Sequence, residues 1–309
     1  MIPEYPKIIP ELILKGSNQL KVNKLSLKNR IISLISHKRI IQDNFIYIKK
    51  RFSNKLHFMP LFTMTMALAY YNDFLRTHNE KYLDLFKTVA QKLLRISQPY
   101  GWKHDNISQL PGYPPKINSY SCLISGRGLG VIIRYYQLNK NKDLLKKIDK
   151  ILDSFEIQSD DGGLLKPTGH FLEYSWGNKS PVVWNGYMSA LVGLYDCFLY
   201  GPKQTKAKAK RIFDKSIRIL ENDLDQLIYS TKHFKWIRYD NNKLYFASGF
   251  YMMIEIEQLK YLYHATENEK FKNYHDILSY INKQYSQKKK YYQIYYSIKR
   301  RFTKSKVTN

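Results

Sequence analysis

The sequence predicts a mainly α-helical protein, an α/α toroid or incomplete α/α barrel of stacked helical hairpins with short β-hairpins in the rim loops. Four long segments are apolar on most faces, and a more amphipathic segment follows each after a polar turn. A tyrosine marks the end of each apolar segment and recurs about every 60 residues, which indicates repeated helix pairs. The apolar segments are 58–75, 118–138, 184–199 and 246–263, the amphipathic ones are 81–94, 142–155, 207–220 and 270–281, and the marker tyrosines are Tyr71, Tyr136, Tyr195 and Tyr261.

The two kinds of segment predict two layers. The apolar helices should line an inner ring, and the amphipathic helices, with their Lys-rich faces, should form an outer one. The long connections between hairpins hold much of the Trp, Tyr, Gly and Pro, and 162–174 and 227–240 carry β-hairpin signals. Long connections are often functional, so we expect them to gather at one rim over a central cleft. An irregular helical domain is the alternative, because the repeats differ in sequence.

The hairpins define the expected domain, residues 56–285. Residues 1–55 form a basic amphipathic extension, and residues 286–309 form a basic tail that mixes Lys and Arg with Tyr. Either segment could lie on an anionic membrane surface or grip an anionic polymer. A solvated helix and a frayed tail are the structural alternatives, and the second is favoured for the last ten residues.

Composition predicts a globular protein with an anionic partner. The 309 residues include 51 Lys and Arg against 25 Asp and Glu, a formal charge of +26. Such an excess favours nucleic acid, an acidic glycan or an anionic membrane surface, with a general Lys-rich bias as an equally weighted alternative. Cys122 and Cys197 fit core positions. We see no signal peptide and no membrane-spanning stretch, so we expect a cytoplasmic location, peripheral at the inner membrane face.

Common catalytic motifs are missing from the sequence. It has no phosphate-binding loop and no nucleophile elbow, and its eight histidines follow no metal-ligand spacing. The Gly-rich stretch 125–130 lies inside a helical pattern, so its glycines favour close helix packing or substrate approach over dinucleotide binding. The acidic stretch 159–163 is too short for a calcium loop and fits a turn. We therefore expect neither a metal nor a cofactor.

Tyrosines, a glutamate and basic residues on the connections are the chemical groups that remain. A phenol can act as general acid or base when nearby cations lower its pKa from about 10. Such chemistry suits the α-proton of a uronic acid. Because the adjacent carboxylate disfavours further negative charge, an Arg or Lys must neutralise it in the transition state.

Three blocks in the expected order resemble one family. "LEYSWGNKSPVVWNGYMSALVGLYD" resembles the Glu-Tyr, Ser-Pro, Asn-Gly-aromatic and Leu-x-Gly-Leu-Tyr-Asp signature of the D-glucuronyl C5-epimerase C-terminal domain. "SYSCLISGRGLGVIIRYYQL" and "WIRYDNNKLYFASGFYMMIEIEQLKYLYHAT" resemble two further blocks of that domain. The resemblance covers roughly 57–285 and is strongest over 118–264. It implies an α/α toroid and C5 inversion of glucuronic acid residues to iduronic acid in polymers such as heparosan, without a redox cofactor.

The resemblance also implies catalytic residues. Tyr174 matches the tyrosine after the family's glutamate, which is Glu173 here, and Tyr239 matches the tyrosine of its Tyr-Asp pair. Tyr251 matches the tyrosine that opens the last inner helix. Inversion needs proton exchange on both faces of a planar carbanion. We expect Tyr174 or Tyr251 to remove the C5 proton and another of the three tyrosines to return one, with Glu173 tuning or relaying protons.

Basic residues near these tyrosines are candidates for binding the substrate. Arg238, with Lys235 nearby, could hold the substrate carboxylate through a planar guanidinium. An ion pair between Arg238 and Asp240 is the structural alternative. Arg127 replaces a family glutamine on an inner helix, where a buried cation calls for an anionic partner such as the substrate.

Three more residues have paired interpretations. Asn185 matches the family's Asn of Asn-Gly-aromatic and is a candidate for substrate binding, with a helix cap as the alternative. Trp184 and Trp176 could stack on a sugar face or anchor the connection. The family often carries histidines after its last tyrosine, where this chain has Met252 and Glu255.

Four functions compete at this stage. The first is a C5-epimerase acting on an acidic polysaccharide or a lipid-linked oligosaccharide, with a homodimer among the expected partners. A polysaccharide lyase would start with the same proton abstraction but expel the 4-linked sugar. A non-catalytic glycan- or membrane-binding protein would keep only the scaffold. Nucleic-acid binding is suggested by charge alone and is not expected, because no recognition motif accompanies it.

Overall fold

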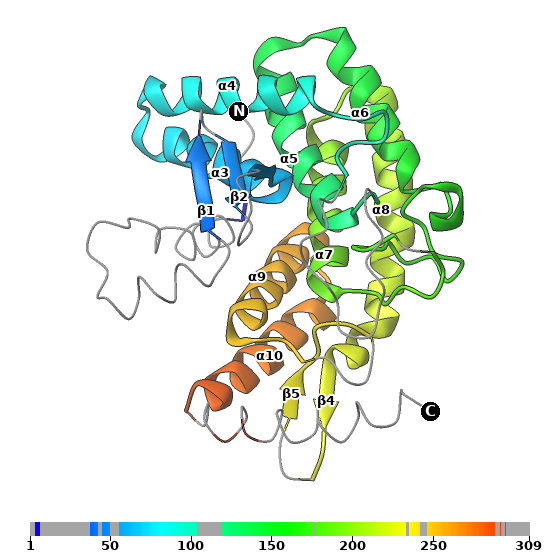
Figure 1. Cartoon of the computed structure of the whole chain (residues 1–309). Coiled ribbons are helices and arrows are strands. Elements are labelled where there is room, and N and C mark those ends of the chain that lie inside the picture. Colours follow the sequence, from blue (N-terminus) through cyan, green and yellow to red (C-terminus); the bar gives the residue numbers. More distant parts are fainter. Residues whose placement is uncertain are drawn as a thin grey trace, which may run out of the picture.

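The computed structural model describes residues 4–6, 38–42, 45–49, 56–103, 119–175, 177–232, 235–241 and 246–287, together with Tyr291 and Ile294 (Figure 1). The described residues are mainly helical, as predicted. Their eight α-helices form four consecutive hairpins, which follow one another in Figure 1 from cyan through green and yellow to orange. The hairpins are α3 (Pro60–Thr77) with α4 (Glu80–Arg95), α5 (Cys122–Asn139) with α6 (Lys142–Ser154), α7 (Trp184–Tyr200) with α8 (Lys203–Asp223), and α9 (Gly249–Thr266) with α10 (Glu269–Gln287).

One turn closes three of the four hairpins. In each, the residue after the first helix takes left-handed backbone angles and donates its N–H to a carbonyl four residues earlier. The following asparagine accepts a backbone N–H of the second helix through its side chain and so caps it. The pairs are His78–Asn79, Lys140–Asn141 and Glu267–Asn268. This shared turn supports the internal repeat.

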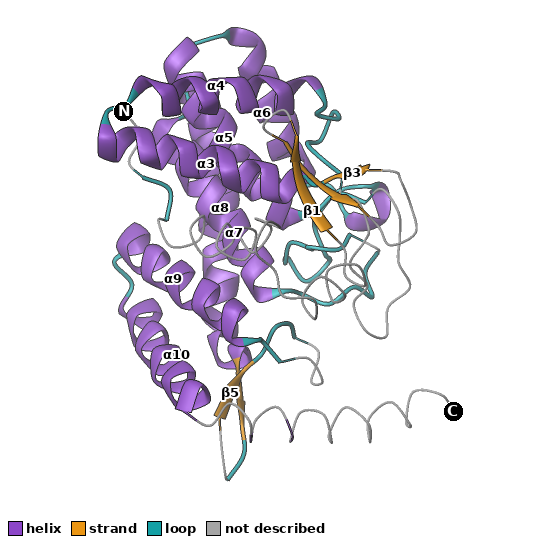
Figure 2. Cartoon of the chain, turned by 60° about the vertical axis from the view of Figure 1, so that its left-hand side comes forward, coloured by secondary structure: helices purple, strands orange, loops and turns teal. Residues whose placement is uncertain are grey.

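The hairpins form two layers. The first helices pack in series, α3 against α5, α5 against α7 and α7 against α9, while α6 packs against α8 outside them. Figure 2 shows α4 and α10 on the outside of this row. The first 14 residues of α5 are all buried, whereas α4 and α6 bury one stripe each. The inner and outer layers are as the sequence predicted.

The inner helices run parallel. Arg127 of α5 reaches Thr65 of α3, and both residues lie in the second turn of their helix. Near the far ends, Tyr261 of α9 reaches Asp196 of α7. The contacts therefore join residues at matching positions along neighbouring helices. The N-termini of the four inner helices lie at the same end of the bundle.

Glycines allow α5 and α7 to pack backbone against backbone. A Cβ on Gly126 would lie 2.3 Å from the Ser189 carbonyl oxygen, and a Cβ on Gly193 would lie 2.1 Å from the Gly126 carbonyl oxygen. A Cβ on Gly128 would lie 2.2 Å from the Trp102 ring. Close packing, one of the two roles predicted for the stretch 125–130, is confirmed.

The connections between hairpins meet at the N-terminal end of the inner helices. Trp184 donates its backbone N–H to the Tyr239 carbonyl at 3.1 Å, which joins the second and third connections. Cys122 donates its backbone N–H to the Leu172 carbonyl at 2.9 Å, which joins the start of α5 to the second connection. The described parts of the second and third connections thus meet at this end, while most of the first connection lies outside the described residues.

Short strands and 3-10 turns complete the described fold. The predicted hairpin in 227–240 is present, whereas that in 162–174 is a tight turn with an isolated bridge between Leu165 and Phe171. A three-stranded antiparallel sheet, not anticipated from the sequence, includes the end of the basic amphipathic extension. Most of 1–55 and 286–309 lies outside the described residues. The elements are β1 (Lys38–Gln42), β2 (Phe45–Lys49), β3 (Leu56–Phe58), η2 (Ser159–Asp161), η3 (Leu224–Leu227), β4 (Ile228–Ser230) and β5 (Lys235–Ile237).

Candidate active site

Glu173 lies at the centre of the rim where the connections meet. It belongs to the connection before α7, and its side chain rests on the first turn of that helix. A Cβ on Gly186 would lie 2.4 Å from the Glu173 Oε2 atom. Gly186, in the first turn of α7, therefore leaves the space that this carboxyl occupies. Any side chain at position 186 would displace it.

The predicted tyrosines meet around this glutamate. The Tyr174 and Tyr239 hydroxyls hydrogen-bond to the Glu173 carboxylate and to each other. The Tyr251 ring packs edge-on against the Tyr239 ring, with 4.8 Å between the ring centroids. Tyr174 and Tyr239 are buried, while Tyr251 is half-buried and lies toward solvent. Two phenols thus bind one carboxyl, and a third phenol packs against one of them.

The electrostatics of this group favour shared protons. Burial raises the pKa of Glu173 to about 7, against the opposing effects of the Tyr174 hydrogen bond and the Arg127 charge. Burial also raises the pKa of Tyr239 well above its ordinary value, and the nearby Glu173 adds to the rise. From the sequence we expected nearby cations to lower the pKa of a catalytic tyrosine. For Tyr239 the pKa moves the other way, so this phenol stays protonated and acts as a hydrogen-bond donor.

Arg127 is the buried cation beside the group. It is 1% exposed and donates from Nη1 to the Thr65 hydroxyl at 2.7 Å. Burial lowers its pKa, while the nearby Tyr5, Glu173 and Tyr251 raise it. Among the described residues no carboxylate lies within ion-pair distance of Arg127, and its Nε has no hydrogen-bond partner. A buried guanidinium without an ion pair suits an incoming anion.

The other two predicted cations lie on the β4–β5 hairpin. The Arg238 guanidinium lies 5.7 Å from the Tyr229 ring centroid, and its backbone N–H bonds to the Leu227 carbonyl. Lys235 is exposed. Neither is among the groups that act on the Glu173 carboxyl, so the geometry favours Arg127 as the cation that serves the tyrosines.

The remaining predicted residues lie deeper. Asn185 is buried, and its side-chain Oδ1 has no hydrogen-bond partner among the described residues. The cap of α7 is Val183, so Asn185 does not have the capping role. Trp184 has no exposed surface and packs against His170, which suits the loop-anchoring alternative. Trp176 lies outside the described residues.

Two residues near the site were not predicted to take part in it. Glu255, one turn after Tyr251 on α9, is fully buried, and neither carboxyl oxygen has a hydrogen-bond partner among the described residues. Burial, and after it the neighbouring Asp240 and Glu173, raise its pKa well above the ordinary value. The spacing of four from Tyr251 was the available signal. Tyr5 had none.

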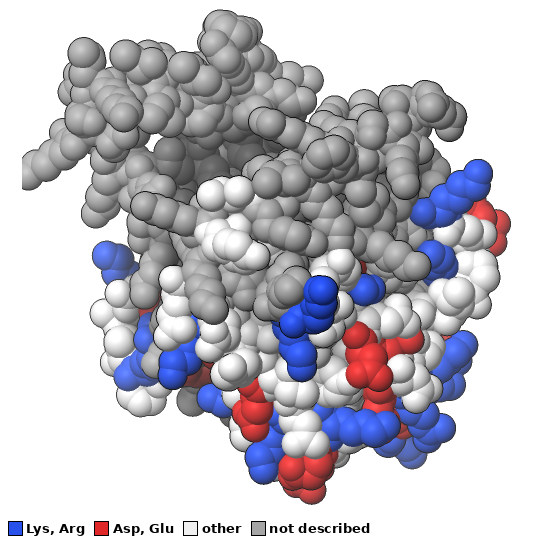
Figure 3. Space-filling view, turned by 90° about the horizontal axis from the view of Figure 1, so that it is seen from below, with Lys and Arg blue, Asp and Glu red and all other residues white. Residues whose placement is uncertain are grey.

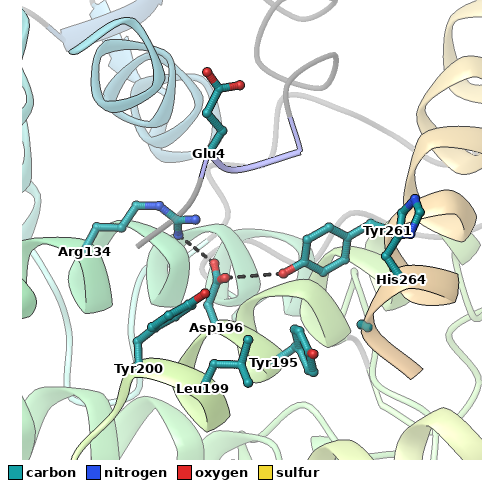
Figure 4. Close-up of a pocket in the computed structure, with 9 residues that line it drawn as sticks. Glu4, Arg134, Tyr195, Asp196, Leu199, Tyr200, Tyr261 and His264 are labelled. Carbon is teal, nitrogen blue, oxygen red and sulfur yellow. Dashed lines mark hydrogen bonds and ion pairs between the residues drawn. The ribbon is translucent and has the colours of Figure 1, made fainter. Parts of the chain in front are cut away.

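A second buried polar cluster lies at the other end of the inner helices. Arg134 of α5 pairs with Asp196 of α7 at 2.6 Å, and the Tyr261 hydroxyl of α9 lies 3.4 Å from the same carboxylate (Figure 4). A cavity of about 180 Å³ adjoins them, lined also by Glu4 and His264. This cluster ties three inner helices together away from the tyrosines.

The comparisons with known proteins agree with the geometry. A family described as D-glucuronyl C5-epimerase C-terminus matches residues 114–279, just over half of the chain. The chain belongs to this family. The residues that act on Glu173 all lie in the part of the chain that matches the epimerase family, whereas Tyr5 lies outside that part. A D-glucuronyl C5-epimerase of Caenorhabditis elegans is 33% identical over 82 residues, 25% of this chain and 13% of that relative. The chain thus corresponds to a small part of this epimerase's length.

The described residues contain neither a metal-binding group of side chains nor a membrane-spanning helix. Their His, Cys, Asp and Glu side chains form no group that could hold a metal ion. None of the helices in the described ranges is both long and apolar enough to cross a bilayer.

Proposed function

We propose that this protein is a cofactor-independent C5-epimerase that converts D-glucuronic acid residues to L-iduronic acid. Its substrate is an acidic polysaccharide or a lipid-linked precursor. The observation that carries the proposal is the contact of Tyr174 and Tyr239 with Glu173 and of Tyr251 with Tyr239, inside the region that matches the epimerase family. The four hairpins are then an incomplete α/α toroid with its active site at the rim.

The proposed reaction begins with neutralisation of the substrate carboxylate. Arg127 binds that carboxylate, so that negative charge can build up on it as the C5 proton leaves. Tyr174 takes the C5 proton on its phenol oxygen while its own proton passes to Glu173, to which it is hydrogen-bonded. The electron pair of the broken C5–H bond is delocalised into the carboxylate.

Inversion is completed from the other face. Tyr251 donates its hydroxyl proton to C5, and the new C–H bond uses the delocalised electron pair. Tyr239 stays protonated and stabilises Glu173 and Tyr174 through its hydrogen bonds. Solvent then returns a proton to Tyr251 and removes one from Glu173, which restores the starting state. Each proton and electron pair is accounted for without a redox cofactor.

Positive charge supports an acidic polymer as the partner. A hollow on α8 is lined by Lys210, Arg211, Lys215 and Arg218, with Asp214 among them. On the face in Figure 3, the described Lys and Arg side chains alternate with Asp and Glu, so binding there would be spread over several sites. A homodimer and a cytoplasmic location, peripheral at the inner membrane face, remain predictions from the sequence.

Proton exchange tests the proposal. The protein is incubated with heparosan-like polymer in deuterated water, and deuterium at C5 is measured. We expect deuterium at C5, iduronate formation and an intact chain, with loss of exchange in Tyr174→Phe. Tyr280→Phe, on the exposed side of α10, is the matched control and should exchange like the wild type.

Other outcomes separate the competing functions. An ultraviolet-absorbing unsaturated end group with chain cleavage would show a lyase instead. Polymer binding without any exchange, unaffected by Tyr174→Phe, would show a non-catalytic binding protein.

A further inference from the structure

Tyr5 lies in the middle of the fold although it is remote in sequence from the rest of the site. Its backbone N–H donates to the Asn72 Oδ1 at 2.9 Å, and its carbonyl accepts from the Asn72 Nδ2 at 2.9 Å. Its side chain is 1% exposed. Asn72 belongs to the inner helix α3, so this short N-terminal segment is fixed inside the row of inner helices.

The Tyr5 ring runs along one face of α5. A Cβ on Gly130 would lie 3.1 Å from the Tyr5 Cε2 atom, so the glycine leaves room for the ring. The Arg134 guanidinium lies 5.4 Å from the ring centroid. Arg134 and Arg127 are seven residues apart, which places both on the same face of α5, about 10 Å from one another along its axis. The ring therefore spans the space between the two buried arginines.

The Tyr5 hydroxyl ends beside Arg127. The charges of Arg127, Asp196 and Arg134 all act on this phenol. The Asp196 Oδ2 atom lies on the same face of α5 as the ring, 3.5 Å from where a Cβ on Gly130 would be. Burial raises the pKa of Tyr5 to about 12, and the phenol is neutral. The Tyr5 hydroxyl lies close enough to Arg127 for each group to shift the pKa of the other, whereas the Arg127 Nε has no hydrogen-bond partner among the described residues. The neutral phenol thus leaves the charge of Arg127 available to another anion.

We propose that Tyr5 is a positioning residue that holds Arg127 toward Tyr251 and Glu173 and separates it from Asp196. This inference rests on the proposed function, in which Arg127 binds the substrate carboxylate. The ring and the Asp196 carboxylate both lie beside Gly130, so removing the ring would open space next to a carboxylate that could then attract the Arg127 guanidinium. The N-terminal segment then completes a site whose other residues all lie in the family-matched region.

Two substitutions test this in the full-length chain. Tyr5→Leu removes the reach of the ring but keeps an apolar side chain, and Tyr5→Phe removes only the hydroxyl. Tyr71→Phe is the matched control, because Tyr71 is equally buried and its ring centroid lies 5.5 Å from the same Arg134 guanidinium. Thermal unfolding shows whether each variant is folded. C5 deuterium exchange gives kcat and KM, and inhibition by carboxyl-reduced polymer measures binding that does not involve the carboxylate.

We expect kcat/KM for the uronate polymer to fall roughly tenfold or more in Tyr5→Leu and about threefold in Tyr5→Phe, with inhibition by the carboxyl-reduced polymer unchanged. Tyr71→Phe should behave like the wild type. If Tyr5→Leu does not fold, the KM of Tyr5→Phe decides. Wild-type kinetics in a folded Tyr5→Leu, or an equal loss for both polymers, would overturn the positioning role alone. A wild type without any exchange would overturn the proposed function and this inference with it.

Discussion

Replacing Glu173 by Gln should make the protein more stable and less active. Gln keeps the size of the side chain and still accepts the tyrosine hydrogen bonds, but it carries no charge at any pH. In the folded wild type, burial raises the pKa of Glu173 from 4.5 to about 7. The folded form therefore binds this proton more tightly than the unfolded chain does.

The size and sign of the effect follow from that pKa. Each pKa unit corresponds to about 1.4 kcal/mol, so ionising Glu173 destabilises the fold by about 3 kcal/mol. Because the folded pKa is raised, the contribution to stability is fully present below pH 4.5 and is lost as pH rises to about 7. Glu173→Gln should match the wild type near pH 4 and exceed it by about 3 kcal/mol near pH 8.

Urea unfolding of both proteins across this pH range measures the difference. The difference between the two curves of unfolding free energy against pH cancels the contributions of all other titrating groups, provided that the dependence on urea has the same slope in both proteins. A difference that does not vary with pH would refute the reasoning, as would a variant that is less stable than the wild type near pH 8. C5 exchange should be lost in the variant, because the carboxylate can no longer take the Tyr174 proton.

Three further predictions follow from the same contacts. The wild-type kcat/KM for C5 exchange should rise with pH through about 7, the value to which burial raises the pKa of Glu173, and a pH–rate profile that is flat there would contradict the base role. Asp196→Asn should lower the free energy of unfolding by about 3 to 5 kcal/mol, since it leaves Arg134 buried without its carboxylate; an unchanged urea midpoint would contradict this. Gly186→Ala should abolish most exchange while the protein stays folded by circular dichroism, because its Cβ would displace the Glu173 carboxyl, and normal activity would show that the carboxyl has room to move.

The helical hairpins could be predicted because their signals are local. The apolar and amphipathic segments fix eight helices with ends close to those expected, as α6 at Lys142–Ser154 illustrates. The left-handed turns at His78, Lys140 and Glu267 were not foreseen, since none of these residues favours such backbone angles. The pairing of β1 with β2 could not be predicted either, because a hydrophobic pattern does not show which strand pairs with which.

The candidate site could be predicted in part. Tyr174, Tyr239 and Glu173 stand in motifs that resemble one family, and the structure brings them together. The choice between Arg127 and Arg238 needed the fold, because only the packing of α5 beside the rim shows which guanidinium is near the phenols. Tyr5 could not be found, since its anchor on Asn72 is 67 residues away and leaves no local pattern.

The most direct test of the central claim is the deuterium content at C5 after incubation of a uronate polymer with the protein in deuterated water. Phenols on two faces of the sugar predict deuterium at C5 in both the glucuronate and the newly formed iduronate residues, with no iduronate formed by Tyr251→Phe. Absence of C5 deuterium in every uronate polymer or lipid-linked oligosaccharide tried, or undiminished iduronate formation by Tyr251→Phe, would contradict the account.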